Sequence, residues 1–324
     1  MTDIAMIEAA AERLEGQVRR TPLLSSAALD RIAGRRVLVK ADCLHLTGSF
    51  KARGAWAAVS ALPPEVRARG VIAYSSGNHA QGVAMAAAAH GVAALIIMPA
   101  DAPSAKIEGT RALGGEVVLY DRAAGEDRDA LGARLSVERG LTMVRPYDDP
   151  QVIAGQGTTG LEIAEQARAM GVTRADVIVC CGGGGLSSGI ALALEARAPG
   201  LRVRTAEPAG FDDMARSLSS GKRAHNDRPS GSVCDAIVTP TPGQLTLPVL
   251  ARLAGPGLVV SDDEAMRAVA LAFRHLKIVV EPGGAVALAA ALFRRDEITG
   301  DDVIAVATGG NVDAPMFARA LAMA

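Results

Sequence analysis

The stretch ADVIVCCGGGGLSSGIALALEARA, residues 175–198, contains the pattern that decides the fold class. Its run VIVCC reads as a short buried β-strand, and its run SSGIALALEARA has apolar residues three and four positions apart, as a helix does. The four glycines between them, residues 182–185, let backbone N–H groups turn toward an anion at the start of the helix. This order predicts an open α/β sheet with a ligand at the carboxyl end of the strand.

The alternation of strand and helix continues on both sides of this stretch. Short runs rich in Val, Ile and Leu predict further strands at residues 35–41, 70–76, 93–100, 115–121, 201–208, 275–284 and 302–310. Alanine-rich segments with helical spacing predict helices at residues 79–91 and 159–171. The pattern therefore indicates one open α/β sheet or two of them, and the polar stretch 217–232 is expected to be a long surface loop.

The composition narrows the choice of partners. The chain has 324 residues, of which 49% are hydrophobic and 21% are charged, and its formal net charge is −1. Because there is no basic surplus, we expect a small-molecule ligand, and neither nucleic acid nor a membrane as partner. The N-terminal region mixes acidic with apolar side chains and does not resemble a secretory signal, so we expect a cytoplasmic location. The cysteines form neither a CxxC pair nor a zinc pattern, and we expect them to be buried.

One lysine has an unusual setting, in the stretch TGSFKARGA at residues 47–55. Lysine is scarce in this chain, with five in all, at positions 40, 51, 106, 222 and 277. Four of them lie beside strand-like runs or in segments that are expected to be helix surface or loop. Lys51 lies instead among small residues and next to Phe50. It is therefore the lysine most suited to chemistry.

Further polar residues follow two other predicted strands. The stretch SSGNHAQGVA, residues 75–84, places hydroxyl, amide and imidazole groups at the start of a helix, a combination that suits an oxygen anion: Ser75, Ser76, Asn78 and His79. Capping of the helix explains one or two of these residues but not all of them. The stretch ATGGNVD, residues 307–313, presents the hydroxyl of Thr308 beside two glycines.

The glycine loop alone leaves a second class of ligand open. Strict GxGxxG fails in this loop, but Gly183, Gly185 and Gly189 give the looser GxGxxxG, and Glu207 lies at about the distance where an acid would hold a ribose. A nucleotide-binding regulatory protein or an oxidoreductase therefore remains a rival interpretation of this loop.

Taken together, the motifs resemble the fold-type II family of pyridoxal-phosphate enzymes, and within it the threonine and serine dehydratases and the serine racemases. The stretches RRTPL, TGSFKARGA, SSGNHAQGVA, VIAGQGTTGLEI, CGGGGL, EPAGFDD, VEPGGAVALAA and TGGNVD follow the order of the family. The resemblance implies two open, twisted α/β domains of the tryptophan synthase β type, with the cofactor in the cleft between them. Residues 1–50 and 146–324 would form the large domain that binds the cofactor, residues 51–145 a small mobile domain, and the protein a homodimer.

The resemblance also implies roles for individual residues. Lys51 would hold pyridoxal phosphate covalently and then remove the α-proton, and Thr308 would face the pyridine nitrogen. The implied cofactor-binding residues are Phe50, Lys51, Asn78, Gly182, Gly183, Gly184, Gly185, Leu186, Glu281 and Thr308. The implied substrate-binding residues are Ser75, Ser76, Asn78, His79 and Arg134. Ser76 is also implied as a catalytic residue, because it matches the base on the opposite face of the cofactor in the racemases.

A cation site is implied by EPAGFDD, residues 207–213. Glu207, the backbone carbonyl of Phe211 and Asp213 would bind Mg²⁺ or another divalent cation, since such hard ions prefer oxygen ligands. The alternative is that these acids cap the helix that follows.

The activity that the resemblance implies is β-elimination from L-threonine or L-serine, which gives a 2-oxo acid and ammonia. An amino-acid racemase and a dehydratase that prefers 3-hydroxyaspartate are the alternatives. The chain departs from the common family pattern at residues 42–45, which include His45, and at Arg145. Two interpretations stay open: the departures add positive charge near the cleft, which would suit a substrate with a second carboxylate, or they are surface changes without a role.

Overall fold

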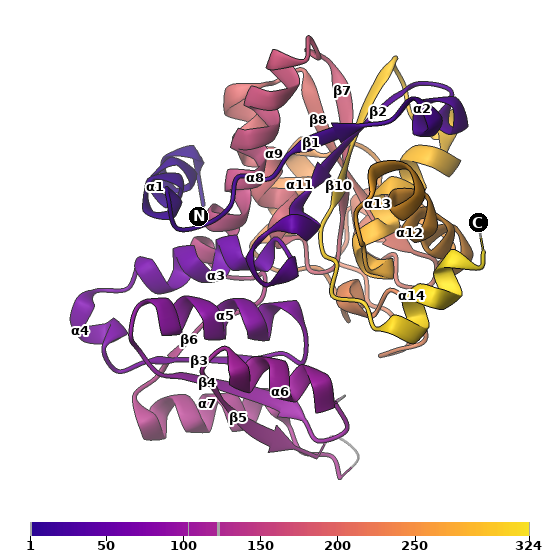
Figure 1. The fold of residues 1–324 in the computed structure, drawn as a ribbon. Coiled ribbons are helices and arrows are strands. Elements are labelled where there is room, and N and C mark those ends of the chain that lie inside the picture. The colour runs from indigo at the N-terminus through magenta and orange to yellow at the C-terminus, as the bar shows by residue number, and fades with distance from the viewer. Residues whose placement is uncertain (1, 103, 122–123, 324) are drawn as a thin grey trace.

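The computed structural model describes residues 2–102, 104–121 and 124–323, which form two lobes, each built around a β-sheet (Figure 1). The larger sheet has six strands in the order β1-β2-β10-β7-β8-β9, and the smaller has four in the order β5-β4-β3-β6. All paired strands are parallel except β1 and β2. The strands are β1 (Leu23–Ser25), β2 (Arg36–Ala41), β3 (Val71–Tyr74), β4 (Ala94–Pro99), β5 (Gly115–Tyr120), β6 (Thr142–Met143), β7 (Ala175–Cys180), β8 (Leu201–Pro208), β9 (Leu258–Val260) and β10 (Asp302–Ala307).

Helices cover both faces of each sheet. In the larger lobe α2, α12 and α13 pack on one face and α8, α9 and α11 on the other, while in the smaller lobe α5 and α7 lie on opposite faces (Figure 1). The α-helices are α1 (Ile4–Leu14), α2 (Ala27–Ala33), α3 (Lys51–Ser60), α4 (Pro64–Arg67), α5 (Asn78–Ala89), α6 (Ser104–Ala112), α7 (Arg128–Arg139), α8 (Pro150–Ala169), α9 (Gly185–Arg197), α10 (Asp213–Ser220), α11 (Thr246–Leu253), α12 (Asp262–Leu276), α13 (Pro282–Phe293) and α14 (Ala314–Leu321). Short 3₁₀ turns are η1 (Asp42–Leu44), η2 (Leu46–Gly48), η3 (Asp235–Ile237) and η4 (Arg295–Glu297).

The predicted fold class, two open α/β units with parallel sheets, is confirmed. Seven of the eight strand predictions, the one at residues 275–284 excepted, fall on β2, β3, β4, β5, β7, β8 and β10. The side chains of β2, β4, β7 and β10 are mostly buried, as expected for strands with a helix on each face, whereas those of the edge strand β5 are mostly half-buried or exposed. The strand predictions do not include the short strands β1, β6 and β9, because these have no hydrophobic run long enough to predict a strand. The boundaries of the predicted domains, residues 51–145 against the rest, remain a prediction.

The prediction of a strand at residues 275–284 is wrong. Ile278 and Val280 are buried and Val279 is 41% exposed, so the burial alternates as it does in a half-buried strand. However, this segment pairs with no strand among the described residues, and it connects α12 to α13 instead. Its backbone is fixed by the hydrogen bond from the Glu281 N–H to the Gly309 carbonyl, at 2.9 Å.

Helix α3 lies between the two lobes and packs against both α5 and α8 (Figure 1). Its residues 52–59 are all buried and mostly small. The approach to α8 is close, because a Cβ atom on Gly155 would lie 2.5 Å from the carbonyl oxygen of Arg53. Since Lys51 is the first residue of α3, this packing sets the position of Lys51.

A buried charge network ties α3 to the large lobe. Arg53, 1% exposed, pairs with Glu162 of α8 at 2.6 Å and with Asp42 at 3.2 Å, and Lys40 of β2 pairs with the same Glu162. Burial alone would raise the pKa of Asp42, but the charges of Arg53 and Lys40 outweigh it and hold that pKa well below its usual range. The two cations and two acids balance, so removing one of them leaves an uncompensated charge.

No helix in the described part of the chain is both long enough and apolar enough to cross a membrane.

Replacing Arg53 with Met tests the network. We expect the free energy of unfolding to fall by about 3–5 kcal/mol, because Asp42 and Glu162 would lose a buried partner. The control is Arg20→Met, since the pair between Arg20 and Glu165 is exposed, and such a pair contributes about 0–1 kcal/mol. Urea denaturation measures both variants. Equal losses of stability in the two would contradict the role given to the network.

Candidate active site

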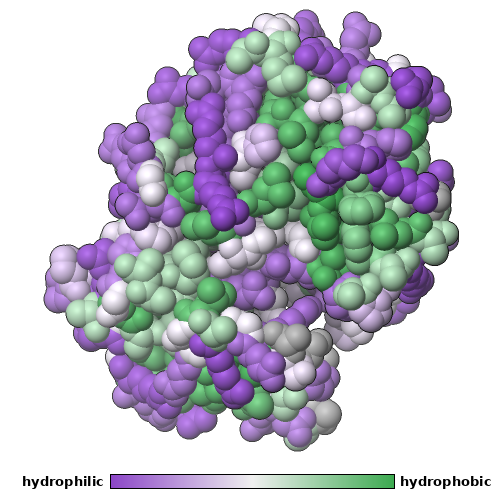
Figure 2. Space-filling view, viewed as in Figure 1, coloured by the Kyte–Doolittle hydropathy of each residue, from purple (hydrophilic) through white to green (hydrophobic). Residues whose placement is uncertain are grey.

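The loops that follow the strands of both sheets meet around one cavity of about 1040 Å³. Figure 2 shows a hollow between the two lobes with hydrophilic side chains in it. The lining comes from the N-terminus of α3, the loop after β3, the glycine loop after β7, the end of β10 and the segment that follows β6. Residues that are far apart in sequence therefore share one site.

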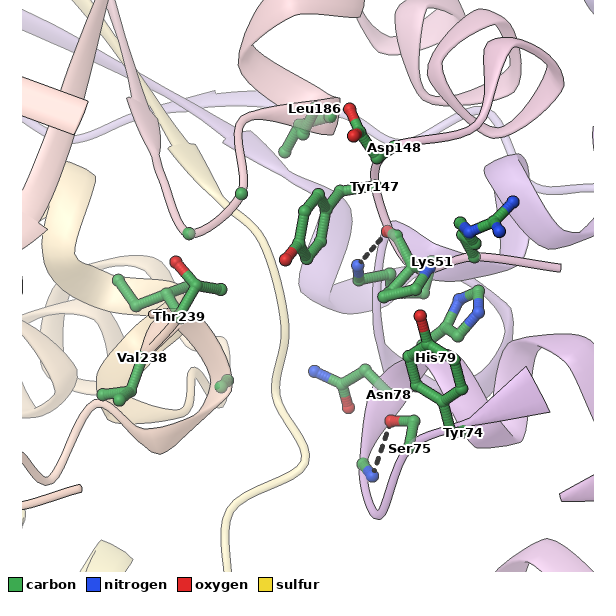
Figure 3. Close-up of a pocket in the computed structure, with 18 of the residues that line it drawn as sticks. Lys51, Tyr74, Ser75, Asn78, His79, Tyr147, Asp148, Leu186, Val238 and Thr239 are labelled. Atoms are coloured by element: carbon green, nitrogen blue, oxygen red, sulfur yellow. Dashed lines mark hydrogen bonds between the residues drawn. The ribbon is translucent and has the colours of Figure 1, made fainter. Parts of the chain in front are cut away.

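Lys51 lies in this cavity without an ion-pair partner among the described residues (Figure 3). Its Nζ donates a hydrogen bond to the carbonyl of Pro146 at 2.7 Å and lies 5.0 Å from the centre of the Phe50 ring. Desolvation lowers the pKa of Lys51 from 10.5 to about 8. About a tenth of the amine would then be neutral at pH 7, against roughly 0.03% for an ordinary lysine.

The end of β10 holds this lysine in place. The Phe50 N–H donates to the carbonyl of Thr308 at 3.0 Å, and Ser49 forms an isolated bridge with Gly309. Thr308 is buried and lines the cavity. The structure thus brings together Phe50, Lys51 and Thr308, as the sequence predicts.

The glycine loop is packed too closely for side chains. A Cβ atom on Gly183 would lie 2.2 Å from the ring of Tyr147, and one on Gly185 would lie 2.7 Å from Oε1 of Gln156. Gly184 has φ +90°, a left-handed conformation, and is the residue before α9. The N-terminus of this 13-residue helix is therefore open to an anion in the cavity.

Two polar side chains beside the glycine loop have buried hydrogen-bonding atoms that are unused. Thr239 Oγ1 and both amide atoms of Gln156 have no partner among the described residues. Both residues line the cavity, and Figure 3 shows Thr239 across the pocket from Lys51, with Tyr147 between them. Since buried polar atoms are normally paired, these atoms point to a polar ligand with oxygen atoms.

Asn78 joins the two lobes at the site. Its Nδ2 donates to Glu281 Oε1 at 2.6 Å, and its Oδ1 accepts a hydrogen bond from Asn311 at 2.7 Å. Burial raises the pKa of Glu281 to about 7, although the bond from Asn78 acts against the rise. The Glu281 side chain does not cap α13. Both predicted cofactor-binding residues are thus in the cavity, bound to each other.

The loop after β3 and the start of α5 carry the predicted substrate residues. Ser75 Oγ accepts a hydrogen bond from the Gly77 N–H at 3.1 Å (Figure 3), and Ser76 lines the cavity with no hydrogen-bond partner among the described residues. His79 Nε2 lies 2.9 Å from the carbonyl of Val144 and must carry the proton. Burial lowers the pKa of His79 to about 3, so its ring is neutral. A neutral ring with an acceptor at Nδ1 does not suit direct contact with a carboxylate.

The comparison with known families decides what this cavity binds. A family model described as "Pyridoxal-phosphate dependent enzyme" matches residues 14–309. The chain belongs to this family of pyridoxal-phosphate dependent enzymes. It is 41% identical over 312 residues to an L-threo-3-hydroxyaspartate ammonia-lyase of Pseudomonas sp., covering 96% of each chain. It is 36% identical to a serine racemase of Schizosaccharomyces pombe, covering 97% of this chain and 96% of that one.

A solved structure agrees with these relatives. A threonine deaminase of T.th. is 42% identical, superposes with a TM-score of 0.90, and is matched over 96% of this chain and 99% of that chain. The predicted resemblance to threonine and serine dehydratases and serine racemases is therefore confirmed. The glycine loop belongs to this family and not to a dinucleotide-binding oxidoreductase.

The cavity of this pyridoxal-phosphate enzyme fits the cofactor. A phosphate suits the glycine loop, where close packing, the N-terminus of α9 and the unpaired hydroxyl of Thr239 come together. An aldehyde suits the partly neutral amine of Lys51, and the ring suits the space beside Phe50. Residues 182–185 with Leu186, Lys51, Phe50 and Thr308 would hold the group.

Two residues expected at or near the cleft, Arg134 for substrate binding and His45 for positive charge, do not line the cavity. Arg134 does not line the cavity; it is exposed on α7 and lies 3.6 Å from Glu138. His45 is buried, its two ring nitrogens are unpaired among the described residues, and desolvation lowers its pKa to about 4, so it adds no charge. Arg145 does line the cavity, as expected.

Several residues that line the site had no signal in the sequence. They are Tyr74, Arg128, Tyr147, Gln156, Arg223 and Thr239. Of these, Gln156 had the clearest available sign, because it lies in the stretch VIAGQGTTGLEI that resembles the family. The other residues lie at the cavity because of tertiary packing, which the periodicity of hydrophobic residues in the sequence does not predict.

The predicted cation residues lie away from the cavity, at the start of α10. Glu207 accepts hydrogen bonds from the N–H groups of Met214 at 2.9 Å and Ala215 at 2.7 Å, which is the capping role considered above. Asp213 accepts a bond from Asn226 through Oδ1, while its Oδ2 is buried and has no partner in the described ranges. Among the described residues, no three His, Cys, Asp or Glu side chains are grouped to hold a metal. The cation site therefore stays a prediction.

Proposed function

We propose that this enzyme is an ammonia-lyase that eliminates water from a β-hydroxy α-amino acid, after which the addition of one water molecule releases ammonia and leaves a 2-oxo acid. The observation that carries the proposal is the amine of Lys51, which is desolvated, has no ion-pair partner among the described residues and lies in a cavity that the N-termini of α5 and α9 also line. Bound pyridoxal phosphate would supply an electron sink for the negative charge that develops at the α-carbon.

The loop after β3 would bind the α-carboxylate of the substrate. Helix α5 has 12 residues and begins at Asn78, which lines the cavity together with Ser75, Ser76 and Gly77, so the N-terminus of the helix lies at the cavity. The hydroxyl of Ser76 is unpaired among the described residues and is free to donate. An amino acid bound in this way would lie beside Lys51.

Lys51 would then act as the general base. Because Nζ donates one proton to the carbonyl of Pro146, the lone pair of the neutral amine is free to take the α-proton. A pKa of about 8 keeps a useful fraction neutral near physiological pH. The α-proton passes to the Lys51 amine, the β C–O bond breaks as a C=C bond forms, and the hydroxyl takes up a proton, which the protonated Lys51 can return, and leaves as water. Addition of water to the released imine then gives the 2-oxo acid and ammonia.

A racemase is the second candidate, and Ser76 supports it. Racemisation needs a second base that returns a proton to the other face of the α-carbon. The Ser76 hydroxyl lines the cavity without a protein partner among the described residues, and one of the relatives is named a serine racemase. The names of the relatives leave L-threonine, L-serine and 3-hydroxyaspartate as substrate candidates.

We also propose a divalent cation such as Mg²⁺ at Glu207, the carbonyl of Phe211 and Asp213. The buried, unpaired Oδ2 of Asp213 supports it, because a hard cation would satisfy this oxygen. The homodimer and the cytoplasmic location remain proposals that rest on the resemblance and the composition.

Removal of divalent ions tests the cation. We expect EDTA to lower the Tm of the enzyme by several degrees and Mg²⁺ to restore it, because an ion that binds only the folded state stabilises it. Asp213→Asn should abolish this response, whereas Asp176→Asn, on β7, should keep it. A wild-type Tm that does not change with EDTA would contradict the proposal.

Replacing Lys51 with Ala tests the lyase. We expect the wild type with cofactor to absorb near 410 nm, roughly the range of a pyridoxal-phosphate imine, and the variant to lose this band. Formation of 2-oxo acid should fall by about 10²–10⁴-fold or more, since both base and anchor are lost. Lys222→Ala, outside the cavity lining, is the control.

Chiral analysis of the product from an L-substrate separates the lyase from the racemase. A dominant D-amino acid would overturn the lyase in favour of the racemase.

A further inference from the structure

One cation in the cavity has no partner among the described residues. Five Lys and Arg side chains line the cavity, and Lys51 among them has the catalytic role proposed above. Three others have partners in the protein. Lys106 pairs with Asp235 at 3.4 Å, Arg128 stacks on Tyr74 at 4.3 Å, and Arg223 donates a hydrogen bond to the Pro242 carbonyl at 2.7 Å. Arg145 makes no hydrogen bond or ion pair with any residue in the described ranges. Its guanidinium is therefore available to a ligand.

The backbone around Arg145 is fixed to the reacting region. On one side, the Val144 carbonyl accepts the hydrogen bond from His79 at 2.9 Å. On the other side, the Pro146 carbonyl accepts the hydrogen bond from the Lys51 amine at 2.7 Å. Arg145 is an exposed residue in the lining of the same cavity, next in sequence to the residue whose carbonyl accepts the hydrogen bond from the Lys51 amine.

The anions of the cofactor and of a simple amino acid already have places. The phosphate fits the N-terminus of α9 and the α-carboxylate fits the N-terminus of α5. Neither place uses a cationic side chain. A serine or threonine substrate would leave Arg145 with water alone.

We propose that Arg145 binds a second carboxylate, on the side chain of the substrate, and so selects β-hydroxy dicarboxylic amino acids of the 3-hydroxyaspartate type. A guanidinium matches a carboxylate with two parallel hydrogen bonds, which gives both affinity and orientation. The inference rests on the proposed lyase function and adds a specificity-determining residue to it.

The rival role for Arg145 is contact with the α-carboxylate, which every substrate carries. In that case, removing its charge would harm all substrates equally. If the side chain is only solvated, removing it would harm none. Comparison of a dicarboxylic with a monocarboxylic substrate therefore separates the three roles.

The kinetic test compares the holoenzyme with its Arg145→Gln variant on L-threo-3-hydroxyaspartate and on L-serine. We expect kcat/KM for the dicarboxylic substrate to fall roughly 10- to 100-fold, and for serine to change less than about threefold. Arg145→Lys should recover part of the loss, since it restores charge but not the paired hydrogen bonds. Arg168→Gln on α8 also removes one exposed positive charge and should change neither value. Equal changes on both substrates would overturn the proposal.

A binding test separates this proposal from the lyase function. Calorimetric titration of the holoenzyme with succinate and with butyrate should show that succinate binds more tightly, and that Arg145→Gln removes the difference. If succinate binding depends on Arg145 but no 2-oxo acid forms from any β-hydroxy amino acid, only the lyase proposal fails. If 2-oxo acid forms but Arg145→Gln leaves the preference for succinate unchanged, the role of Arg145 is overturned.

Discussion

The chemistry of this site depends on one constraint, the placement of the Lys51 amine out of bulk water and away from any ion-pair partner among the described residues. An ordinary lysine is almost fully protonated at neutral pH, whereas desolvation lowers the pKa of Lys51 to about 8. The fold imposes this placement through the close packing of α3 and the Phe50 hydrogen bond to β10. The buried network around Arg53, two residues further along α3, fixes the helix to the large lobe.

The rest of the site follows from the ends of the strands and the starts of helices. Parallel strands direct their following loops toward one edge, and here both sheets direct them toward the cleft between the lobes. Helices α5 and α9 then provide partial positive charge for two anions without placing a cation beside Lys51. Desolvation is therefore what lowers the pKa of Lys51 and makes its amine reactive.

The sequence predicts the features of the fold and site that depend on local pattern. The buried strands, the glycine loop and the polar starts of α5 and α9 were all available from it, because periodicity and glycine placement act locally. It failed at residues 275–284, where alternating burial occurs without a partner strand in the described ranges, and that depends on tertiary neighbours. It did not find Thr239 or Gln156 as site residues, because which side chains reach a cavity, and which are left unpaired in it, depends on packing between distant segments. Arg134 lies outside the cavity lining, and its role in substrate binding stays a prediction.

The most direct test of this account is the pKa of the Lys51 amine itself. The rate at which trinitrobenzenesulfonate labels Lys51 in the cofactor-free protein, with the Lys51→Ala variant subtracted, reports the neutral fraction as pH is varied. The structure predicts a midpoint of about 8, with labelling that rises as pH increases through this value. A midpoint near the ordinary value of 10.5 would mean that the amine is solvated, and it would contradict the account.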